Sequence, residues 1–152
     1  MNIIHRDLHT RNVLINGDMP YICDFGCSIF SDLSYEKPDK VYGVRLYMAP
    51  EVINDKKSSK EADIFGLGRI IFEVITGRLP FHERKNDFFL QFELARGIKP
   101  EIPKDVSRSL KDLMNKCWEI DPENRPNAEY ICDALKEEFN TESNSNVELG
   151  SM

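Results

Sequence analysis

The sequence lacks the features that disulfide-bonded, zinc-binding and membrane-spanning proteins require. Its four cysteines are Cys23, Cys27, Cys117 and Cys132. A zinc site would need a second close cysteine pair or histidines at ligand spacing, and the sequence has neither. The most apolar stretch, 64–75, is too short to cross a membrane and carries Arg69 and Glu73. We therefore expect reduced, mostly packed thiols in a cytoplasmic protein with no membrane segment.

The chain also has fewer positive than negative charges. Lys and Arg together number 20 against 26 Asp and Glu, which gives a formal net charge of −6. This balance does not indicate a surface for nucleic acid or for anionic membranes. No long apolar run precedes the charged residues at 5–7, so no signal peptide is visible. The 152 residues suffice for one domain with a sizeable core.

Hydrophobic periodicity predicts a mostly helical fold with one small β-hairpin near the N-terminus. Two short apolar runs, 13–15 and 21–23, flank Asn16-Gly17-Asp18, a composition typical of a tight hairpin turn. Residues 26–47 lack a clear period, which predicts a long loop. From Glu61 to Gly77, apolar residues recur at helical spacing on most faces, so we expect a buried helix there.

Three further helices are predicted towards the C-terminus. The first covers 86–95 and is rich in phenylalanine, the second follows Ser107 as a candidate N-cap, and the third begins after Asn127. We interpret their apolar stripes as core. Residues 140–152 are rich in Ser, Asn and Glu and are predicted to form a disordered tail, which leaves a domain at 1–139.

Five short motifs occur in a fixed order along this framework. They are His5-Arg6-Asp7 with Asn12, Asp24-Phe25-Gly26, Ala49-Pro50-Glu51, Asp63 with Gly66, and Asn124-Arg125-Pro126. Any one of them could arise by chance. All five in this order, separated by fitting elements, are not expected by coincidence.

In these motifs the chain resembles the carboxy-terminal lobe of a eukaryotic-type protein kinase, from about Ile3 to Phe139. Cys117-Trp118 and the run 47–51 resemble the tyrosine-kinase and tyrosine-kinase-like branch. The resemblance implies a catalytic loop at 5–12 and an activation segment at 24–51. It also implies that the substrates are ATP and a protein, with Mg²⁺ as the cofactor.

The resemblance assigns a role in phosphoryl transfer to several motif residues. Asp7 would orient the attacking Ser/Thr or Tyr hydroxyl and accept its proton. Asn12 and Asp24 would supply oxygen ligands to Mg²⁺, a hard cation. Leu14 would form part of the floor beneath adenine, and Cys23 would line the rear of the nucleotide pocket.

Other motif residues are expected to be structural. Glu51 and Arg125 would form a buried ion pair that tethers the end of the activation segment. Asp63 would hold the backbone of the catalytic loop from below. His5 and Phe25 would belong to a stacked apolar column between lobes.

Arg6, beside the expected base, indicates control by phosphorylation, because in the family this arginine pairs with a phosphate on the activation segment. The candidate acceptors are Ser28, Ser31, Ser34, Tyr35 and Tyr42. We hypothesise that at least one is a switch. The alternative is that they are ordinary loop hydroxyls.

Two positions depart from the serine/threonine kinase pattern. The lysine expected two residues after the catalytic aspartate is His9, and a threonine expected near the segment's end is Val44. A neutral histidine cannot supply a permanent cation to the transferring phosphate. We hypothesise that Arg11 supplies it, as Arg-Asn does in many receptor tyrosine kinases; the alternative is a solvated arginine. The choice between Ser/Thr and Tyr acceptors stays open.

The amino-terminal lobe of the family has no counterpart in these residues. A glycine-rich loop, a strand lysine and its partner glutamate are missing, and Asn2-Ile3-Ile4 would be the remnant of the helix before the catalytic loop. Without that helix, apolar surface on the order of several hundred Å² would be exposed. We expect the chain alone to be inactive, with the missing lobe or another kinase chain as a partner. The alternative is a non-catalytic, pseudokinase-like interaction module or a truncated gene model.

Overall fold

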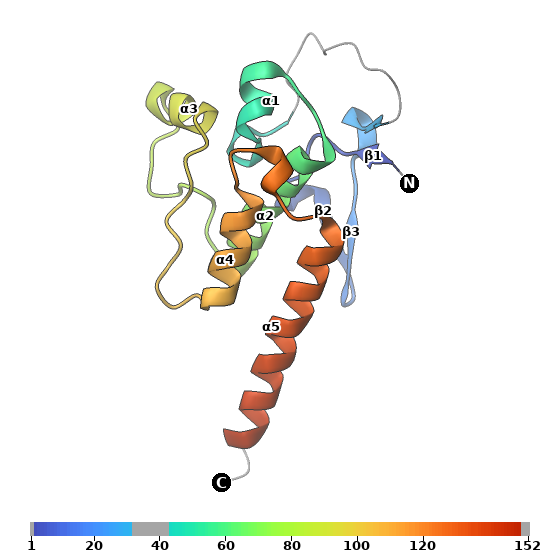
Figure 1. Ribbon diagram of the computed structural model, residues 1–152, viewed down its shortest axis with the longest axis vertical. Helices are drawn as coiled ribbons and strands as arrows, with labels where there is room; N and C mark the ends of the chain where they lie inside the picture. The colour runs from blue at the N-terminus through green and yellow to red at the C-terminus, as the bar shows by residue number, and fades with distance from the viewer. Residues whose placement is uncertain (1, 32–42, 150–152) are drawn as a thin grey trace.

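The computed structural model describes residues 2–31 and 43–149, with side chains up to Asn140 (Figure 1). Its strands are β1 (Ile3–Ile4), β2 (Val13–Asn16), β3 (Met19–Ile22) and β4 (Ile29–Phe30). Its helices are α1 (Pro50–Asp55), α2 (Lys60–Thr76), α3 (Phe88–Ala95), α4 (Arg108–Cys117) and α5 (Ala128–Leu149). Short 3₁₀ turns lie at η1 (Thr10–Asn12), η2 (Phe25–Cys27), η3 (Arg45–Tyr47) and η4 (Pro122–Asn124). The predicted fold, mostly helical with a small hairpin near the N-terminus, is confirmed.

The predicted hairpin is formed by β2 and β3, which pair antiparallel with Asn16 opposite Met19. The two intervening residues make the turn, and Gly17 has a φ of +63°, a conformation that glycine adopts at little cost. Cys23 lies just beyond the end of β3.

A second pair of strands was not predicted. Ile3 and Ile4 form β1 and pair antiparallel with Phe30 and Ile29 of β4. The interpretation of residues 2–4 as a helix remnant is therefore wrong. Within the long loop predicted at 26–47, the described residues form η2, β4 and η3, and residues 32–42 lie outside the described residues. β-Branched isoleucine favours an extended backbone, and each two-residue strand is too short to give a period in the sequence.

The long helix α2 is the centre of the hydrophobic core, as its apolar faces predicted. It begins after Ser59, whose side chain accepts a hydrogen bond from the Ala62 N–H, and it ends at Gly77 with a φ of +65°. Phe65 and Phe72 pack with residues of α4 and α5 in one cluster, which includes Leu110, Met114, Cys117, Trp118 and Ile131. Ser107 caps α4 by accepting a hydrogen bond from the Leu110 N–H, which confirms the predicted cap.

Arg69, the charge within the apolar stretch, is buried inside this core. Its guanidinium lies 4.8–5.2 Å from the ring centroids of Phe65, Phe81 and Trp118, and Nη2 donates a 2.6 Å hydrogen bond to the carbonyl of Ile98. Burial lowers the pKa of Arg69 to about 9. The three aromatic faces stabilise the cation that burial penalises, so the arginine joins α2 to the loop around α3.

The structure differs from the sequence-based expectations at two of the helices. In α3, Leu90 and Leu94 are buried, but Phe88, Phe89 and Phe92 are 79%, 73% and 55% exposed and are not core. The helix α5 continues to Leu149, through most of the segment expected to be a disordered tail. No glycine or proline interrupts this stretch, and its polar residues are compatible with a helix.

The four cysteines are free thiols: Cys117 is buried, Cys23 and Cys27 are half-buried, and Cys132 is exposed. Burial raises the pKa of Cys117 to about 12, so this thiol is unreactive at neutral pH. Among the described residues, none of the helices combines the length and the hydropathy that a membrane crossing needs.

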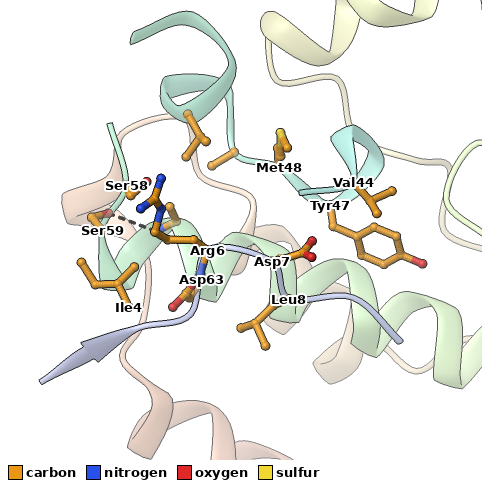
Figure 2. A pocket seen from close by; sticks show the side chains of 14 residues that line it. Ile4, Arg6, Asp7, Leu8, Val44, Tyr47, Met48, Ser58, Ser59 and Asp63 are labelled. Atoms are coloured by element: carbon orange, nitrogen blue, oxygen red, sulfur yellow. Dashed lines mark hydrogen bonds between the residues drawn. The ribbon is translucent and has the colours of Figure 1, made fainter. Parts of the chain in front are cut away.

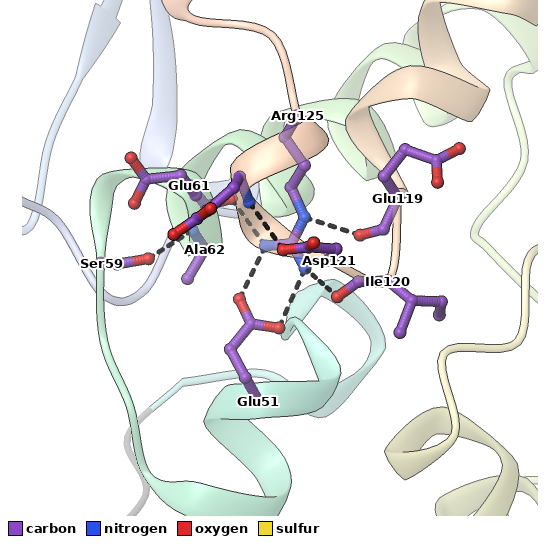
Figure 3. Close-up of polar contacts among 9 residues, drawn as sticks. Glu51, Ser59, Glu61, Ala62, Glu119, Ile120, Asp121 and Arg125 are labelled. Carbon is purple, nitrogen blue, oxygen red and sulfur yellow. Dashed lines mark hydrogen bonds and ion pairs between the residues drawn. The ribbon is translucent and has the colours of Figure 1, made fainter.

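An ion pair between Arg125 and Glu51 joins the start of α1 to the loop before α5 (Figure 3). The guanidinium donates to the two carboxylate oxygens at 2.6 and 2.9 Å. It also donates to the carbonyls of Glu119 and Glu61 at 2.8 and 2.9 Å. The Arg125 side chain is fully buried, which confirms the predicted buried pair.

A groove of about 620 Å³ lies between the hairpin and α2. Its apolar wall includes Val13, Ile22, Ile64, Leu67 and Ile70. Ile22 is more than half exposed, as are Leu14, Ile15, Met19 and Tyr21 on the same hairpin. The groove therefore leaves apolar surface open beside α2, whereas the predicted exposure of several hundred Å² through the loss of a covering helix stays a prediction.

Removing one partner of the Arg125–Glu51 pair is expected to destabilise the fold. Glu51→Ala would leave the buried guanidinium without its counter-charge, so the free energy of unfolding in urea should fall by about 3–5 kcal/mol. The matched control is Asp112→Ala, which removes the exposed Arg108–Asp112 pair and should leave the unfolding midpoint nearly unchanged. Equal effects of the two substitutions would contradict the assignment.

The apolar groove is expected to bind a hydrophobic dye in the native state. Ile22→Gln should lower the fluorescence of 1-anilinonaphthalene-8-sulfonate and reduce self-association in sedimentation, because it removes apolar surface from the groove. Val74→Gln serves as the control, since Val74 is 72% exposed on α2 but does not line the groove. The same loss of fluorescence in both variants would show that the dye binds elsewhere.

Candidate functional site

The loop 5–12 is held from below by Asp63 of α2. Its carboxylate accepts hydrogen bonds from the backbone N–H of His5 at 2.6 Å and of Arg6 at 3.0 Å. Figure 2 shows Asp63 beside Arg6. Burial raises the pKa of the Asp63 carboxyl, while the two backbone donors act in the opposite direction. Arg6 has a φ of +74°, a strained backbone conformation for a side chain of this size. The predicted role of Asp63 is confirmed.

His5 links the loop to the segment that begins at Cys23. Its Nε2 lies 3.0 Å from the carbonyl oxygen of Cys23, and its ring contacts Phe25 edge-on with centroids 5.0 Å apart. The Cys23 N–H donates to the carbonyl of Asn12 at 2.9 Å. These contacts confirm the predicted His5–Phe25 packing and place Asp24 directly beside the end of the loop.

Asp7 is fixed by its backbone on both sides. Its N–H lies 3.3 Å from Nδ1 of His5, and its carbonyl accepts a 2.9 Å hydrogen bond from Nδ2 of Asn12. In Figure 2 the carboxylate lies on the side of the loop that faces Val44 and Tyr47. A small cavity of about 30 Å³, lined by Arg6 and Asp7 among others, lies beside it.

His9 is buried and turned towards Asp7, which the sequence did not reveal. Its Nε2 lies 3.4 Å from Oδ1 of Asp7, and its ring lies against Tyr47 with centroids 5.9 Å apart. A lysine at this position would carry its charge on a longer side chain. The imidazole is held inside the loop instead.

Tyr47, Thr10 and Glu73 form a hydrogen-bonded cluster that was also not predicted. The Tyr47 hydroxyl donates to Oε2 of Glu73, and the Thr10 hydroxyl donates to the same oxygen at 3.0 Å. Burial, together with the hydrogen bond to Glu73, raises the pKa of Tyr47 to about 12. The cluster ties η3 to the loop 5–12 and to α2. No local motif marks it, because the three residues are far apart in the sequence.

The predicted nucleotide and metal residues gather around the hairpin and the loop. Asn12 is buried in η1, whereas Asp24 is exposed, with a left-handed backbone at a φ of 60°, and accepts a hydrogen bond from the Gly26 N–H. Leu14 on β2 is 56% exposed, and Cys23 is half-buried. Arg11 is exposed on η1, and its charge acts on the Tyr47 hydroxyl.

The predicted phosphorylation sites are only partly described. Ser34, Tyr35 and Tyr42 lie outside the described residues. The Ser28 hydroxyl donates to the carbonyl of Phe25 at 2.7 Å, and the Ser31 N–H donates to the carbonyl of Asn2.

The oxygen donors of Asn12 and Asp24 fit a magnesium ion. Nδ2 of Asn12 donates to the carbonyl of Asp7, so the amide oxygen is the Asn12 atom that could coordinate a metal. Across residues 2–31 and 43–140, no cluster of three or more His, Cys, Asp or Glu side chains could hold a metal by itself. Two oxygen ligands without a closed cage suit Mg²⁺, which takes its other ligands from water and phosphate.

The comparisons with known proteins agree with this geometry. Residues 1–138 match the family model described as "Protein kinase domain". The dual specificity protein kinase shkA of Dictyostelium discoideum is 35% identical over 139 residues, covering 88% of this chain and 26% of the relative. The human mitogen-activated protein kinase kinase kinase 7 is 37% identical over 134 residues, covering 85% and 21%.

A further relative, the human mitogen-activated protein kinase kinase kinase 4, is 35% identical over 139 residues, covering 86% of this chain and 9% of its own length. The chain thus spans about a quarter or less of these curated relatives. The family match covers nearly all of the chain, and the motif residues form the contacts that the resemblance implied. The chain belongs to the protein kinase domain family.

Proposed function

We propose that this chain carries the catalytic half-site of a protein kinase, which transfers the γ-phosphate of ATP to a hydroxyl of a protein. The observation that carries the proposal is the pair of hydrogen bonds from His5 and Arg6 to Asp63, because they fix the backbone on which Asp7 stands. The contact between Cys23 and Asn12 then brings Asp24 to the same place. A base and two magnesium ligands are thereby arranged around one loop.

Asp7 acts as the base in this proposal. Its carboxylate orients the hydroxyl of the protein substrate and takes up its proton, while the oxygen forms a bond to the γ-phosphorus. The bond between the γ-phosphorus and the bridging oxygen breaks, and ADP leaves with that electron pair. Catalysis of this kind depends mainly on positioning and charge, so the fixed backbone of the loop is the contribution of the fold.

Asn12 and Asp24 hold Mg²⁺ in this proposal, and Leu14 and Cys23 line the adenine pocket. When bound, the metal neutralises charge on the phosphates. The exposed Leu14 side chain supplies an apolar surface of the kind that a planar base contacts. The half-buried Cys23 lies beside Asp24, at the inner end of that surface.

Arg11 supplies the cation that His9 cannot. The His9 ring is buried and turned to Asp7, whereas Arg11 is exposed on the same turn and acts electrostatically on Tyr47. His9 and Val44 depart from the serine/threonine kinase pattern, and with Cys117-Trp118 and the run 47–51 they support a position in the tyrosine-kinase and tyrosine-kinase-like branch. Relatives named as dual specificity kinases and as mitogen-activated protein kinase kinase kinases fit an acceptor that is a protein hydroxyl.

A second candidate function is a non-catalytic interaction module. The apolar groove between the hairpin and α2 favours it, because exposed apolar surfaces of this kind mark contact sites for other protein segments. A covering lobe or another kinase chain would be the partner, and the groove would then contribute to assembly rather than to chemistry.

The metal site can be tested in the chain itself. Mn²⁺ prefers similar oxygen ligands, so with ATP it should broaden the amide signals around Asn12 and Asp24 in NMR spectra. Asp24→Asn should weaken this effect about tenfold or more, because it removes an ionised ligand. Asp18→Asn in the exposed hairpin turn is the control and should leave the titration unchanged. Equal broadening in both variants would contradict the proposed site.

The purified 152-residue chain is expected to give no detectable phosphate transfer from labelled ATP to a protein. Asp7, Asn12 and Asp24 are present, but the residues that hold the α- and β-phosphates in the family have no counterpart in the sequence. Incorporation of label by this chain would contradict the prediction. The Asp7→Asn variant identifies any contaminating kinase, since transfer that survives this substitution does not come from the chain.

A further inference from the structure

We propose that His9 is a positioning residue for Asp7: its imidazole donates from Nε2 to Oδ1, so that the other carboxylate oxygen faces the substrate hydroxyl. The inference rests on the proposed function, in which Asp7 is the base. It assigns a function to His9, which stands where the serine/threonine kinase pattern has a lysine.

The burial of both groups is the first step. His9 is 7% exposed, and within the described residues the buried Oδ1 of Asp7 makes no formed hydrogen bond. Its polar neighbour is Nε2 of His9 at 3.4 Å, slightly beyond hydrogen-bond length. Catalytic hydrogen bonds are often long in ligand-free sites and shorten when substrate binds. Nε2 of His9 is therefore the donor that can stabilise the buried Oδ1 of Asp7 when this contact shortens.

The surroundings of the two ring nitrogens favour one tautomer. Nδ1 of His9 is buried and has no hydrogen-bond partner among the described residues. A proton on Nδ1 alone would be an unsatisfied buried donor, and the lone pair of Nε2 would then face the carboxylate oxygen of Asp7. The geometry therefore favours a proton on Nε2, directed at Asp7.

The ring is held in place by the end of the activation segment. Tyr47 of η3 lies against it, and the Tyr47 hydroxyl is itself bound to Glu73 of α2. On the backbone side, the His9 carbonyl accepts a 2.9 Å hydrogen bond from the Asn12 N–H. The orientation of Asp7 is thus coupled, through His9, to the position of Tyr47.

Gly43 also lies close to Asp7. It has a φ of +106°, and a Cβ built on it would lie 3.0 Å from both Oδ1 of Asp7 and the carbonyl oxygen of Arg6. Both Gly43 and His9 therefore lie beside Oδ1. The Asp7 side chain is 19% exposed although Oδ1 is buried, so its exposed area belongs to its other atoms. This arrangement leaves Oδ2 for the substrate.

NMR of the imidazole nitrogens in the 152-residue chain tests the contact directly. Long-range ¹H–¹⁵N spectra should show His9 protonated on Nε2 and not on Nδ1, and Asp7→Asn should shift the Nε2 signal. The exposed His82, which lies beside Glu83, is the internal reference and should not respond. A proton on Nδ1 alone, or a His9 ring that does not respond to Asp7→Asn, would overturn the proposal.

Kinetics in an active protein that contains residues 1–152 together with an amino-terminal kinase lobe test the role. His9→Leu removes the donor and should lower kcat by about 10- to 100-fold with KM for ATP unchanged, whereas His9→Gln, which keeps an N–H donor, should recover most of the rate. Arg11→Ala should instead impair ATP use, as expected of a cation at the phosphates. His82→Gln is the control for a remote histidine.

The positioning role of His9 and the role of Asp7 as the base can be refuted by different results. Equal losses in His9→Leu and His9→Gln, or a rise in KM for ATP in both, would overturn the positioning role. Asp7→Asn with an unchanged kcat would refute Asp7 as the base, and with it the proposed function. The NMR result stands independently of either, since it reports the contact and not the reaction.

Discussion

The hydrogen bonds between Asp63 and the backbone of His5 and Arg6 are the contact on which the candidate site depends. Asp63 stands on α2, whose buried residues Phe65 and Phe72 lie in the core with α4 and α5. The carboxylate therefore fixes the loop 5–12 to the rigid core. Most of this loop has no regular secondary structure. Satisfying two backbone donors also offsets the cost of burying this carboxyl group.

A second buried contact holds the other half of the site to the same part of α2. Arg125 binds Glu51 at the start of α1, and it also binds the carbonyl of Glu61, two residues from Asp63. The first turn of α2 thus anchors both the loop 5–12 and the start of α1. Tyr47 and Glu73 make a third connection further along the helix. The three connections explain how short, irregular segments can hold side chains at fixed positions.

Much of this arrangement could be predicted from the sequence, and the failures have physical reasons. The hairpin, the buried helix and the Ser107 cap follow from local composition, and Asp63 and Arg125 follow from motifs. The strand pair β1–β4 was missed because its partners are distant and only two residues long. The inward orientation of His9 could not be predicted, because it depends on Tyr47 from another segment. Phe88 was assigned to the core because periodicity does not say which side of a helix is covered.

Hydrogen exchange of the backbone amides tests the central claim most directly. In the native chain the amides of His5 and Arg6 should exchange slowly, because both donate to the buried carboxylate of Asp63. Asp63→Asn replaces a charged acceptor of two hydrogen bonds by an amide, and both amides should then exchange much faster while the protection of α2 is retained. Unchanged protection of His5 and Arg6 in this variant would contradict the account.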